Sequence, residues 1–305
     1  ADGRVMRLDG GGVTYAMGVD EQGYLQPFYW GQALDEKAPL TARHPTELSG
    51  FDPAGSITAQ EYAGQGEGLV SEPGIKAVFA DGNRDLVLKY RGHKISGETL
   101  TVELADIRRP LTVTLHYVID PATGVIARSA SVRNGDNKPV RIDQIAAATY
   151  TLPVGNDYRL HYLTGRHASE WSQVETPVTP ALTVLESRRG STGHGNQPWF
   201  ALVKDGKGSE TDGPVWYGAL AWSGSFRLSV GLDNLSRVRI SGGYNPYDFS
   251  WTLKPGESLD TPIFYTGYSS KGMGDASRRF HAFQRAAIIP GGAKANIRPV
   301  LYNSW

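Results

Sequence analysis

The sequence contains no cysteine, and this absence excludes disulfides, thiolate nucleophiles and sulfur-ligated metals together. Its 31 lysine and arginine residues equal its 31 aspartate and glutamate residues, so the formal net charge is zero. A neutral chain lacks the basic field that nucleic acids or anionic membranes would require. No run approaches the 18 or so uninterrupted apolar residues of a membrane span. We therefore expect neither nucleic acid nor a membrane as a partner.

Local motifs of metal and nucleophilic chemistry are also scarce. None of the seven histidines forms an HxxxH pair, and there is no G-x-S-x-G elbow. Gly190 to His194 place a serine near a histidine, but proximity along the chain is not triad geometry. The glycine triplet at 10–12 precedes a strand rather than a helix, so it cannot present a helix N-terminus to phosphate. We predict no metal and no cofactor.

What the chain does have is alternation of apolar and polar residues with period two, together with 37 glycines and 31 aromatic residues. The clearest strand is 111–119, and turn chemistry predicts a meander that continues through 125–133 and 140–152. Further hairpins are predicted at Asp81-Gly82, Ser223-Gly224, Asp233-Asn234 and Pro255-Gly256. About fifteen or more strands at this spacing predict an all-β sandwich of antiparallel sheets.

Three segments depart from that pattern. Residues 34–74 are rich in proline, glycine and small residues, which predicts a functional loop or a wrapping segment. Residues 275–287 predict a helix that has Asp275 as N-cap and Phe280, Phe283 and Ala287 on one apolar stripe. Residues 298–305 predict a short apolar strand without a partner, which we interpret as the first strand of a further domain.

One carboxylate is suggestive of sugar chemistry. Glycosidases hold two carboxyl groups a few ångström apart across the scissile bond, and no local pattern marks such a pair here. Glu170 stands beside Trp171, and an aromatic wall with a carboxylate can hold a sugar. The alternative is an ordinary pair at the end of a strand.

Short motifs run in order along nearly the whole chain. They are GYL at 23–25 with YWG at 29–31, ESRRG at 186–190 with His194 and PWFAL at 198–202, NPYDFSW at 245–251 with LKPGES at 253–258, and RPVLYNSW at 298–305. In this order they resemble the N-terminal part of the family-36 glycoside hydrolases, the microbial α-galactosidases.

The resemblance implies a galactose-mutarotase-like β-supersandwich over 1–272, a helical linker over 273–297 and the start of a (β/α)₈ barrel over 298–305. It also implies retaining hydrolysis of terminal α-galactosides such as melibiose and raffinose-type sugars. The two aspartates that catalyse this reaction in the family lie on barrel strands beyond position 305. The resemblance therefore implies no catalytic residue in this chain.

Substrate contacts implied by the resemblance lie at two places. Trp305 matches an aromatic residue of the galactose pocket, at the C-terminal end of the first barrel strand, the face where barrels carry their chemistry. The loop of Thr164 to Trp171 matches one that reaches toward this pocket in the family. His167 stands where the family often has tryptophan, so either Trp171 substitutes for it or the substrate differs. His167, Glu170 and Trp171 are the candidate substrate contacts of this loop.

The resemblance names partners as well. Family members are often tetramers in which N-terminal domains pack against neighbouring subunits, so we expect a homo-oligomer, the chain's own barrel and an oligosaccharide substrate as partners. An initial alanine fits a removed export signal, which would place the protein in the periplasm or outside the cell. It fits a trimmed, cytoplasmic chain equally well.

Two other functions stay open. The chain could be an independent carbohydrate-binding module with its own stacking patch. It could also be a mutarotase-type epimerase, for which His194 and Glu186 are the first candidates as the catalytic pair.

Overall fold

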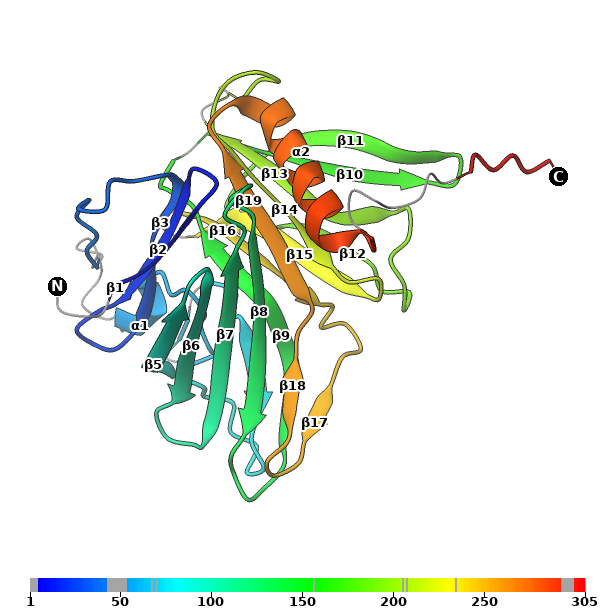
Figure 1. Cartoon of the computed structure of the whole chain (residues 1–305). Helices are drawn as coiled ribbons and strands as arrows, with labels where there is room; N and C mark the ends of the chain where they lie inside the picture. Colours follow the sequence, from blue (N-terminus) through cyan, green and yellow to red (C-terminus); the bar gives the residue numbers. More distant parts are fainter. Residues whose placement is uncertain are drawn as a thin grey trace.

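The computed structural model describes residues 5–42, 54–66, 68–69, 71–155, 157–204, 206, 208–233, 235–291 and 299–304. These residues form nineteen strands and a few helical segments (Figure 1). The strands are β1 Val5–Gly10, β2 Val13–Val19, β3 Leu25–Gln32, β4 Ile75–Val78, β5 Leu88–Ser96, β6 Thr99–Asp106, β7 Leu111–Ile119, β8 Ile126–Asn134, β9 Val140–Thr151, β10 Tyr158–Arg166, β11 Ser169–Pro177, β12 Thr183–Glu186, β13 Asn196–Lys204, β14 Val215–Ala221, β15 Phe226–Leu232, β16 Val238–Tyr244, β17 Trp251–Leu253, β18 Ser258–Asp260 and β19 Ile263–Ser269. The helical segments are α1 Ala54–Ile57, α2 Gly272–Phe283 and the π-helical turn η1 Gln284–Ile288.

Three antiparallel sheets contain all of these strands. A small sheet has the order β1-β2-β3. The ten-stranded sheet has the order β11-β10-β13-β14-β19-β8-β7-β6-β5, and β18 also pairs with β8. The six-stranded sheet has the order β12-β15-β16-β9-β17, and β4 also pairs with β9. The predicted all-β architecture of antiparallel sheets is confirmed.

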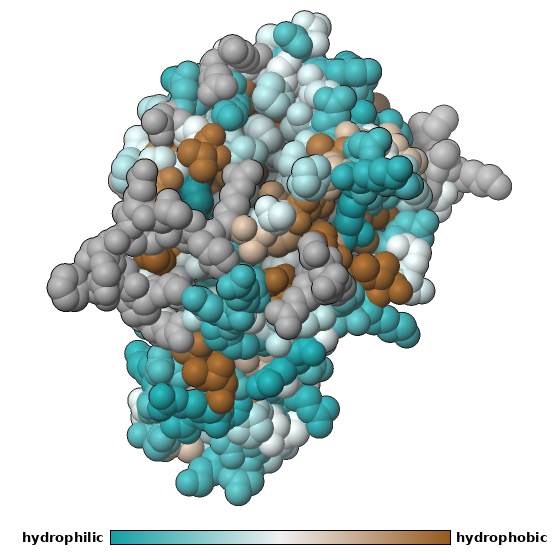
Figure 2. Space-filling view, turned by 90° about the vertical axis from the view of Figure 1, so that its left-hand side faces the viewer, coloured by the Kyte–Doolittle hydropathy of each residue, from teal (hydrophilic) through white to brown (hydrophobic). Residues whose placement is uncertain are grey.

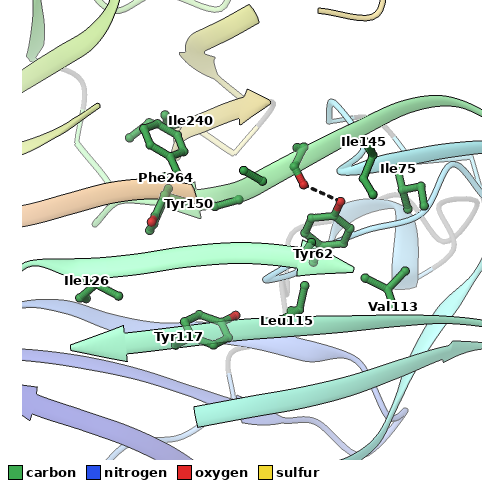
Figure 3. Close-up of a cluster of buried hydrophobic side chains, with 14 of the residues drawn as sticks. Tyr62, Ile75, Val113, Leu115, Tyr117, Ile126, Ile145, Tyr150, Ile240 and Phe264 are labelled. Atoms are coloured by element: carbon green, nitrogen blue, oxygen red, sulfur yellow. Dashed lines mark hydrogen bonds between the residues drawn. The ribbon is translucent and has the colours of Figure 1, made fainter. Parts of the chain in front are cut away.

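The core lies between the two larger sheets, and alternation along the strands fills it. In β7, Leu111, Val113, Leu115, Tyr117 and Ile119 are all buried, as the period-two pattern predicts. Figure 3 shows side chains from β7, β8, β9, β16 and β19 converging in this core. The hydroxyl of Tyr62 donates to the carbonyl of Ala146 at 2.8 Å, which satisfies a polar group in an otherwise apolar region.

The segment over 34–74 is a wrapping segment where it is described, and it enters the core. Glu61 has a fully buried side chain and forms an ion pair with Arg128 at 2.9 Å. The hydroxyls of Tyr15 and Tyr117 donate to the same carboxylate oxygen, Oε1, at 2.6 and 2.9 Å. Burial of both charges is tolerable because they compensate each other and receive additional hydrogen bonds.

Several predicted hairpins are wrong, because the turn joins strands of different sheets. The turns at Asp81-Gly82, Ser223-Gly224 and Pro255-Gly256 connect β4 to β5, β14 to β15 and β17 to β18, and each pair divides between the two larger sheets. The meander ends at β8 for the same reason, since β9 joins the six-stranded sheet. Turn residues fix a local reversal of the chain but not the neighbour that the next strand finds. The turn at Asp233 does join the paired strands β15 and β16, although Asn234 lies outside the described residues.

The predicted helix exists but begins and ends differently. It starts at Gly272, so Asp275 lies in its first turn and accepts hydrogen bonds from the Ser269 hydroxyl and Arg279 Nε at 2.6 and 2.7 Å. Phe280 and Phe283 are buried as predicted. Ala287 is exposed, because the π-helical turn η1 changes the rotation per residue beyond Phe283.

The predicted C-terminal strand is not formed in the residues that the structure describes there. Residues 299–304 have no regular secondary structure, and Val300 is 98% exposed. A strand requires a neighbour for its backbone hydrogen bonds, and no described strand pairs with this segment. Trp305 lies outside the described residues.

Figure 2 shows the side nearest β1–β3, where hydrophobic patches are small and separated by hydrophilic residues. Within the described ranges, no helix is long and apolar enough to cross a membrane.

Candidate functional site

Helix α2 packs on the outer face of the ten-stranded sheet, opposite the core. Because side chains alternate along a strand, both faces of this sheet carry apolar residues. Phe200 of β13 belongs to the core between the sheets, whereas Ala201 and Val203 belong to the cluster under the helix. Tyr217 of β14 packs against Phe280 with ring centroids 5.5 Å apart. The helix therefore stands on a second, smaller apolar core (Figure 1).

A groove with a volume of about 460 Å³ lies between this helix and the hairpin β10–β11. Leu163 and Trp171 of the hairpin line one side, and Met273, Phe280 and Gln284 line the other. Figure 1 shows the hairpin projecting beside α2, near the C-terminal end of the described chain. The groove has the size of a small-molecule site, and its walls are mainly apolar.

The tip of the hairpin is closely packed. The register shifts between Thr164 and Arg166, which places a bulge at Gly165. A Cβ atom on Gly165 would lie 2.5 Å from the carbonyl oxygen of Ser169, so only glycine fits there. The backbone N–H of Ala168 donates to Glu170 Oε1 at 3.0 Å. The predicted residues His167 and Glu170 are thus exposed at the tip, and Glu170 stabilises the turn.

Trp171 is the residue that connects the hairpin to the groove. Its side chain is 64% exposed, and it lines the groove together with Trp199. Its backbone φ is 65°, a left-handed conformation that is strained for a bulky residue. Such strain persists only where the surrounding structure imposes it, and it is concentrated at binding sites. The structure thus places one predicted tryptophan where a ligand can reach it.

The loop over 187–195, which contains the motif around Arg188 and His194, supports the hairpin. The hydroxyl of Thr164 donates to the carbonyl of Gly195 at 2.5 Å, and the N–H of Gly165 donates to the same oxygen at 3.2 Å. The tip of the hairpin is therefore held by a segment some thirty residues farther along the chain.

A second motif meets this loop through Asn245. Its Nδ2 donates to Glu186 Oε2 at 3.0 Å, to the Ser187 carbonyl at 3.0 Å and to the Phe226 carbonyl at 3.1 Å. Arg188 forms an ion pair with Glu186 at 2.5 Å and lies over the ring of Tyr247. The two motif segments thus form one structural unit beneath the hairpin.

This use of Glu186 argues against an epimerase pair. Both of its oxygens are held, by Arg188 and Asn245, and no described hydrogen bond or ion pair joins it to His194, which is exposed. A mutarotase-type mechanism needs the two groups to face one substrate. No described hydrogen bond or ion pair brings these two side chains together, and the Glu186 carboxylate is occupied by other partners.

The groove can bind but has no acids for hydrolysis. Among the described residues that line it there is no aspartate or glutamate; its polar side chains are those of Gln197, Tyr217, Ser277, His281 and Gln284, together with the indoles of Trp171 and Trp199. A glycosidase needs two opposed carboxyl groups. The described residues also contain no cluster of three potential metal ligands. Apolar and aromatic walls with a few hydrogen-bonding groups suit contact with a ligand or a neighbouring domain.

Sequence reasoning missed the helical half of the groove. Met273, Ser277, Phe280 and Gln284 recur at three- and four-residue spacing, which marks one helical face. This spacing predicts that one face of the helix packs against another element. It does not predict that the hairpin β10–β11 lies opposite that face.

His161 of β10 was also missed. Burial lowers its pKa, although the nearby Glu175 carboxylate opposes this shift from 3.8 Å. Its Nδ1 is buried and has no hydrogen-bond partner among the described residues. Protonation of this ring would therefore put a charge in a poorly solvated place.

The family model of the glycosyl hydrolase family 36 N-terminal domain matches residues 23–254. The chain belongs to this family. The match includes the hairpin β10–β11 and both motif segments that meet at Asn245, and it ends before α2 begins.

Curated relatives of this family 36 domain are longer enzymes. The chain is 28% identical to the alpha-galactosidase AgaA of Geobacillus stearothermophilus over 326 residues, which covers 98% of this chain and 44% of that protein. It is 28% identical to the alpha-galactosidase Mel36A of Lactobacillus acidophilus, covering 99% of this chain and 45% of that protein. The chain therefore spans less than half the length of these relatives.

Solved structures agree with this assignment. The crystal structure of AgaA matches with a TM-score of 0.86 at 27% identity, covering 93% of this chain and 43% of that one. A variant of AgaA in complex with raffinose matches with a TM-score of 0.85, covering 92% and 43%. The predicted supersandwich of the family 36 N-terminal domain is thus confirmed.

Proposed function

We propose that this chain is the non-catalytic N-terminal domain of an α-galactosidase that hydrolyses terminal α-galactosides of the melibiose and raffinose type. Three findings support the proposal: membership of the family 36 N-terminal domain, coverage of about 44% of relatives named as alpha-galactosidases, and the raffinose complex of one such relative. The observation that carries it is a groove with aromatic walls but no carboxylate among its described lining residues. Such a groove can shape a substrate pocket or receive a domain, but it cannot cleave a glycosidic bond.

In this proposal the two catalytic aspartates belong to a (β/α)₈ barrel that follows residue 305 in the complete polypeptide, and the residues from α2 onward form the linker to it. Trp171, Glu170 and His167 stand at the barrel-facing end of the domain, and Trp305 belongs to the first barrel strand. The side of Trp171 offers an apolar face of the kind on which sugar C–H groups stack.

The first test uses the 305-residue chain. We expect no hydrolysis of nitrophenyl α-galactoside, and a dissociation constant for galactose weaker than about 1 mM, near −4 kcal/mol, by calorimetry. Hydrolysis by this chain would refute the proposal. Tight galactose binding would favour an independent carbohydrate-binding module, for which the exposed Trp171 is the supporting observation.

The second test uses the polypeptide extended through its barrel. Trp171→Ala is expected to raise KM for raffinose about two- to tenfold, because one aromatic stacking contact is worth ~0.5–1.5 kcal/mol. Trp251→Ala is the matched control, since Trp251 has a similar exposure of 51% but lies on β17, outside the groove. Equal KM values for the unaltered enzyme, Trp171→Ala and Trp251→Ala would show that Trp171 does not contact the substrate.

Assembly is part of the same proposal. The enzyme is expected to be a homotetramer in which N-terminal domains contact neighbouring subunits. Light scattering of the extended polypeptide measures this directly, and a monomeric mass would contradict it.

A further inference from the structure

A second pocket lies on the outer face of the six-stranded sheet, and the groove beside α2 shares none of its lining residues. Its volume is about 450 Å³, enough for a mono- or disaccharide. Strand alternation builds its floor: Val230 and Ile240 face the core, whereas Ser229, Arg239 and Ser241 project from the opposite side of β15 and β16. These side chains give the pocket a polar floor that the core does not use.

Arg239 carries the excess charge of this pocket. Nearby, Arg227 is paired with Glu72, and Arg237 is paired with Asp233 at 2.6 Å. Arg239 donates from Nη1 to the Gln60 carbonyl at 3.1 Å and to the Thr151 hydroxyl, and no described carboxylate lies within 4.0 Å of it. The three arginines thus outnumber the two acids beside them by one positive charge, and Asp233 and Glu61 attract Arg239 only from beyond ion-pair distance.

This guanidinium has no direct ion-pair partner among the described residues. Burial, together with the nearby Arg237, lowers the pKa of Arg239 to about 10 against the opposing attraction of Asp233 and Glu61, so the group is still charged at neutral pH. A buried charge is stabilised when an anion supplies hydrogen-bond acceptors to it. A guanidinium presents its donors in a planar fork that matches a carboxylate. The remaining donors of Arg239 are therefore suited to a carboxylate ligand.

The other walls indicate what the rest of the ligand looks like. The hydroxyls of Ser236 and Ser241 line the pocket and have no hydrogen-bond partner in the described part of the chain. Leu182 and Leu232 add an apolar side. Two carboxylates, Glu72 and Asp233, also line the pocket. Arg227 and the Ser229 hydroxyl hold the oxygens of Glu72, and Arg237 is paired with Asp233, so both charges are compensated. Free hydroxyls beside an apolar wall match a sugar ring.

We propose that this pocket binds a small hydroxylated carboxylate of the hexuronic acid class, with the carboxylate on Arg239 and ring hydroxyls on Ser241 and Ser236. This site is separate from the groove beside Trp171. Only binding is proposed for it, so it requires no catalytic carboxylate. It would give the domain an affinity for an acidic sugar that is independent of α-galactoside hydrolysis.

The test compares two probes that differ at one carbon. D-galacturonate carries a carboxylate where D-galactose carries a hydroxymethyl group. Calorimetry of both sugars with the 305-residue chain therefore measures how much the carboxylate contributes to binding affinity. We expect D-galacturonate to bind at least about tenfold more tightly than D-galactose, as for a charge-assisted pair, and more weakly as salt is raised. Equal binding of the two sugars, or no binding of D-galacturonate, would overturn the proposal.

Substitutions locate the binding. Arg239→Gln is expected to abolish D-galacturonate binding, whereas Arg141→Gln is expected to leave it unchanged. Arg141 lies on β9 of the same sheet, is exposed and is paired with Asp143 outside the pocket. Binding that survives Arg239→Gln unchanged would overturn the assignment.

A second variant tests the site even if Arg239→Gln fails to fold. Ser241→Val removes one hydroxyl and places methyl groups in the pocket, and a β-branched residue suits a strand. It is expected to weaken D-galacturonate binding at least about tenfold without disturbing the hydrogen bonds of Arg239. Unchanged affinity in this variant would also refute the proposed site.

Discussion

Asn245 Nδ2 donates to Glu186 Oε2 at 3.0 Å, which joins residues that lie 59 positions apart in the chain. The same amide group reaches the carbonyls of Ser187 and Phe226. Because the segment after Glu186 also holds the tip of the hairpin β10–β11, this one side chain supports the position of Trp171. The motif segments around Glu186 and Asn245 thus maintain the shape of the groove, whereas Pro198 and Trp199 of the motif at 198–202 line it.

Replacing Asn245 by alanine tests that support. The change leaves two buried carbonyl groups and a carboxylate oxygen without this donor, so we expect a loss of about 2 kcal/mol in the free energy of unfolding. Urea denaturation followed by tryptophan fluorescence measures it. Asn137→Ala, in the exposed turn before β9, is the control and should change little. An unchanged midpoint for Asn245→Ala would show that the amide contributes nothing.

The ion pair of Glu61 and Arg128 gives a second prediction. Arg128→Met leaves a fully buried carboxylate without its cation, so we expect a loss of about 3–5 kcal/mol in the free energy of unfolding. The double variant Glu61→Gln/Arg128→Met removes both charges and should recover part of this loss. Arg141→Met, which breaks an exposed ion pair, should have little effect. A double variant less stable than Arg128→Met would contradict the explanation.

The tip of the hairpin gives a third prediction. Gly165→Ala places a Cβ atom 2.5 Å from the Ser169 carbonyl oxygen, so the bulge must open. We expect a cost of ~1–3 kcal/mol and faster hydrogen exchange at Ala168. Gly193→Ala is a matched control in the supporting loop, because no atom lies within 4 Å of the place that its Cβ would take. Equal exchange rates in both variants would show that the tip tolerates the methyl group.

The fourth prediction concerns pH and His161. Burial lowers its pKa below the ordinary value of about 6.5, so the folded state binds a proton less readily than the unfolded state. The contribution of the neutral ring to stability is complete above about pH 6.5 and is lost as pH falls toward the lowered pKa. His161→Gln should therefore reduce the fall in melting midpoint between about pH 6.5 and pH 5.

His194→Gln is the control for that measurement, because His194 is exposed in the supporting loop. The fall in melting midpoint below about pH 6.5 should be the same in this variant as in the unaltered chain. If His161→Gln retains the full dependence on pH, the buried ring is not its source.

Much of the fold could be predicted because its cause is local. Alternation of side chains identified β7 and β8, and the turn at Pro121 to Gly124 correctly joined them into a hairpin. The distribution of strands between sheets could not be predicted. The turn at Ser223-Gly224 has ordinary hairpin residues, yet β14 pairs with β13 and β19 in one sheet and β15 pairs with β12 and β16 in the other. Such choices depend on contacts between faces that no local pattern encodes.

The site was predictable only in part. The aromatic residue beside a carboxylate marked Trp171 and Glu170, but it did not show that the carboxylate stabilises the turn while the ring lines the groove. Arg239 was overlooked, since an arginine in a strand has no distinctive sequence neighbourhood. Its proposed role rests on the lack of a direct ion-pair partner among the described residues, which only three-dimensional packing determines.

Glu61 reaches Arg128 from a segment that lies outside the strands of both larger sheets, and this has a consequence for how the chain folds. Were the sandwich to close before that segment arrived, it would trap a lone guanidinium among Tyr15, Tyr117 and Tyr150. Because a lone buried charge is strongly unfavourable, we expect insertion of the segment and closure of the sheets to be coupled. A species with both sheets assembled and this stretch still solvated should never accumulate during refolding.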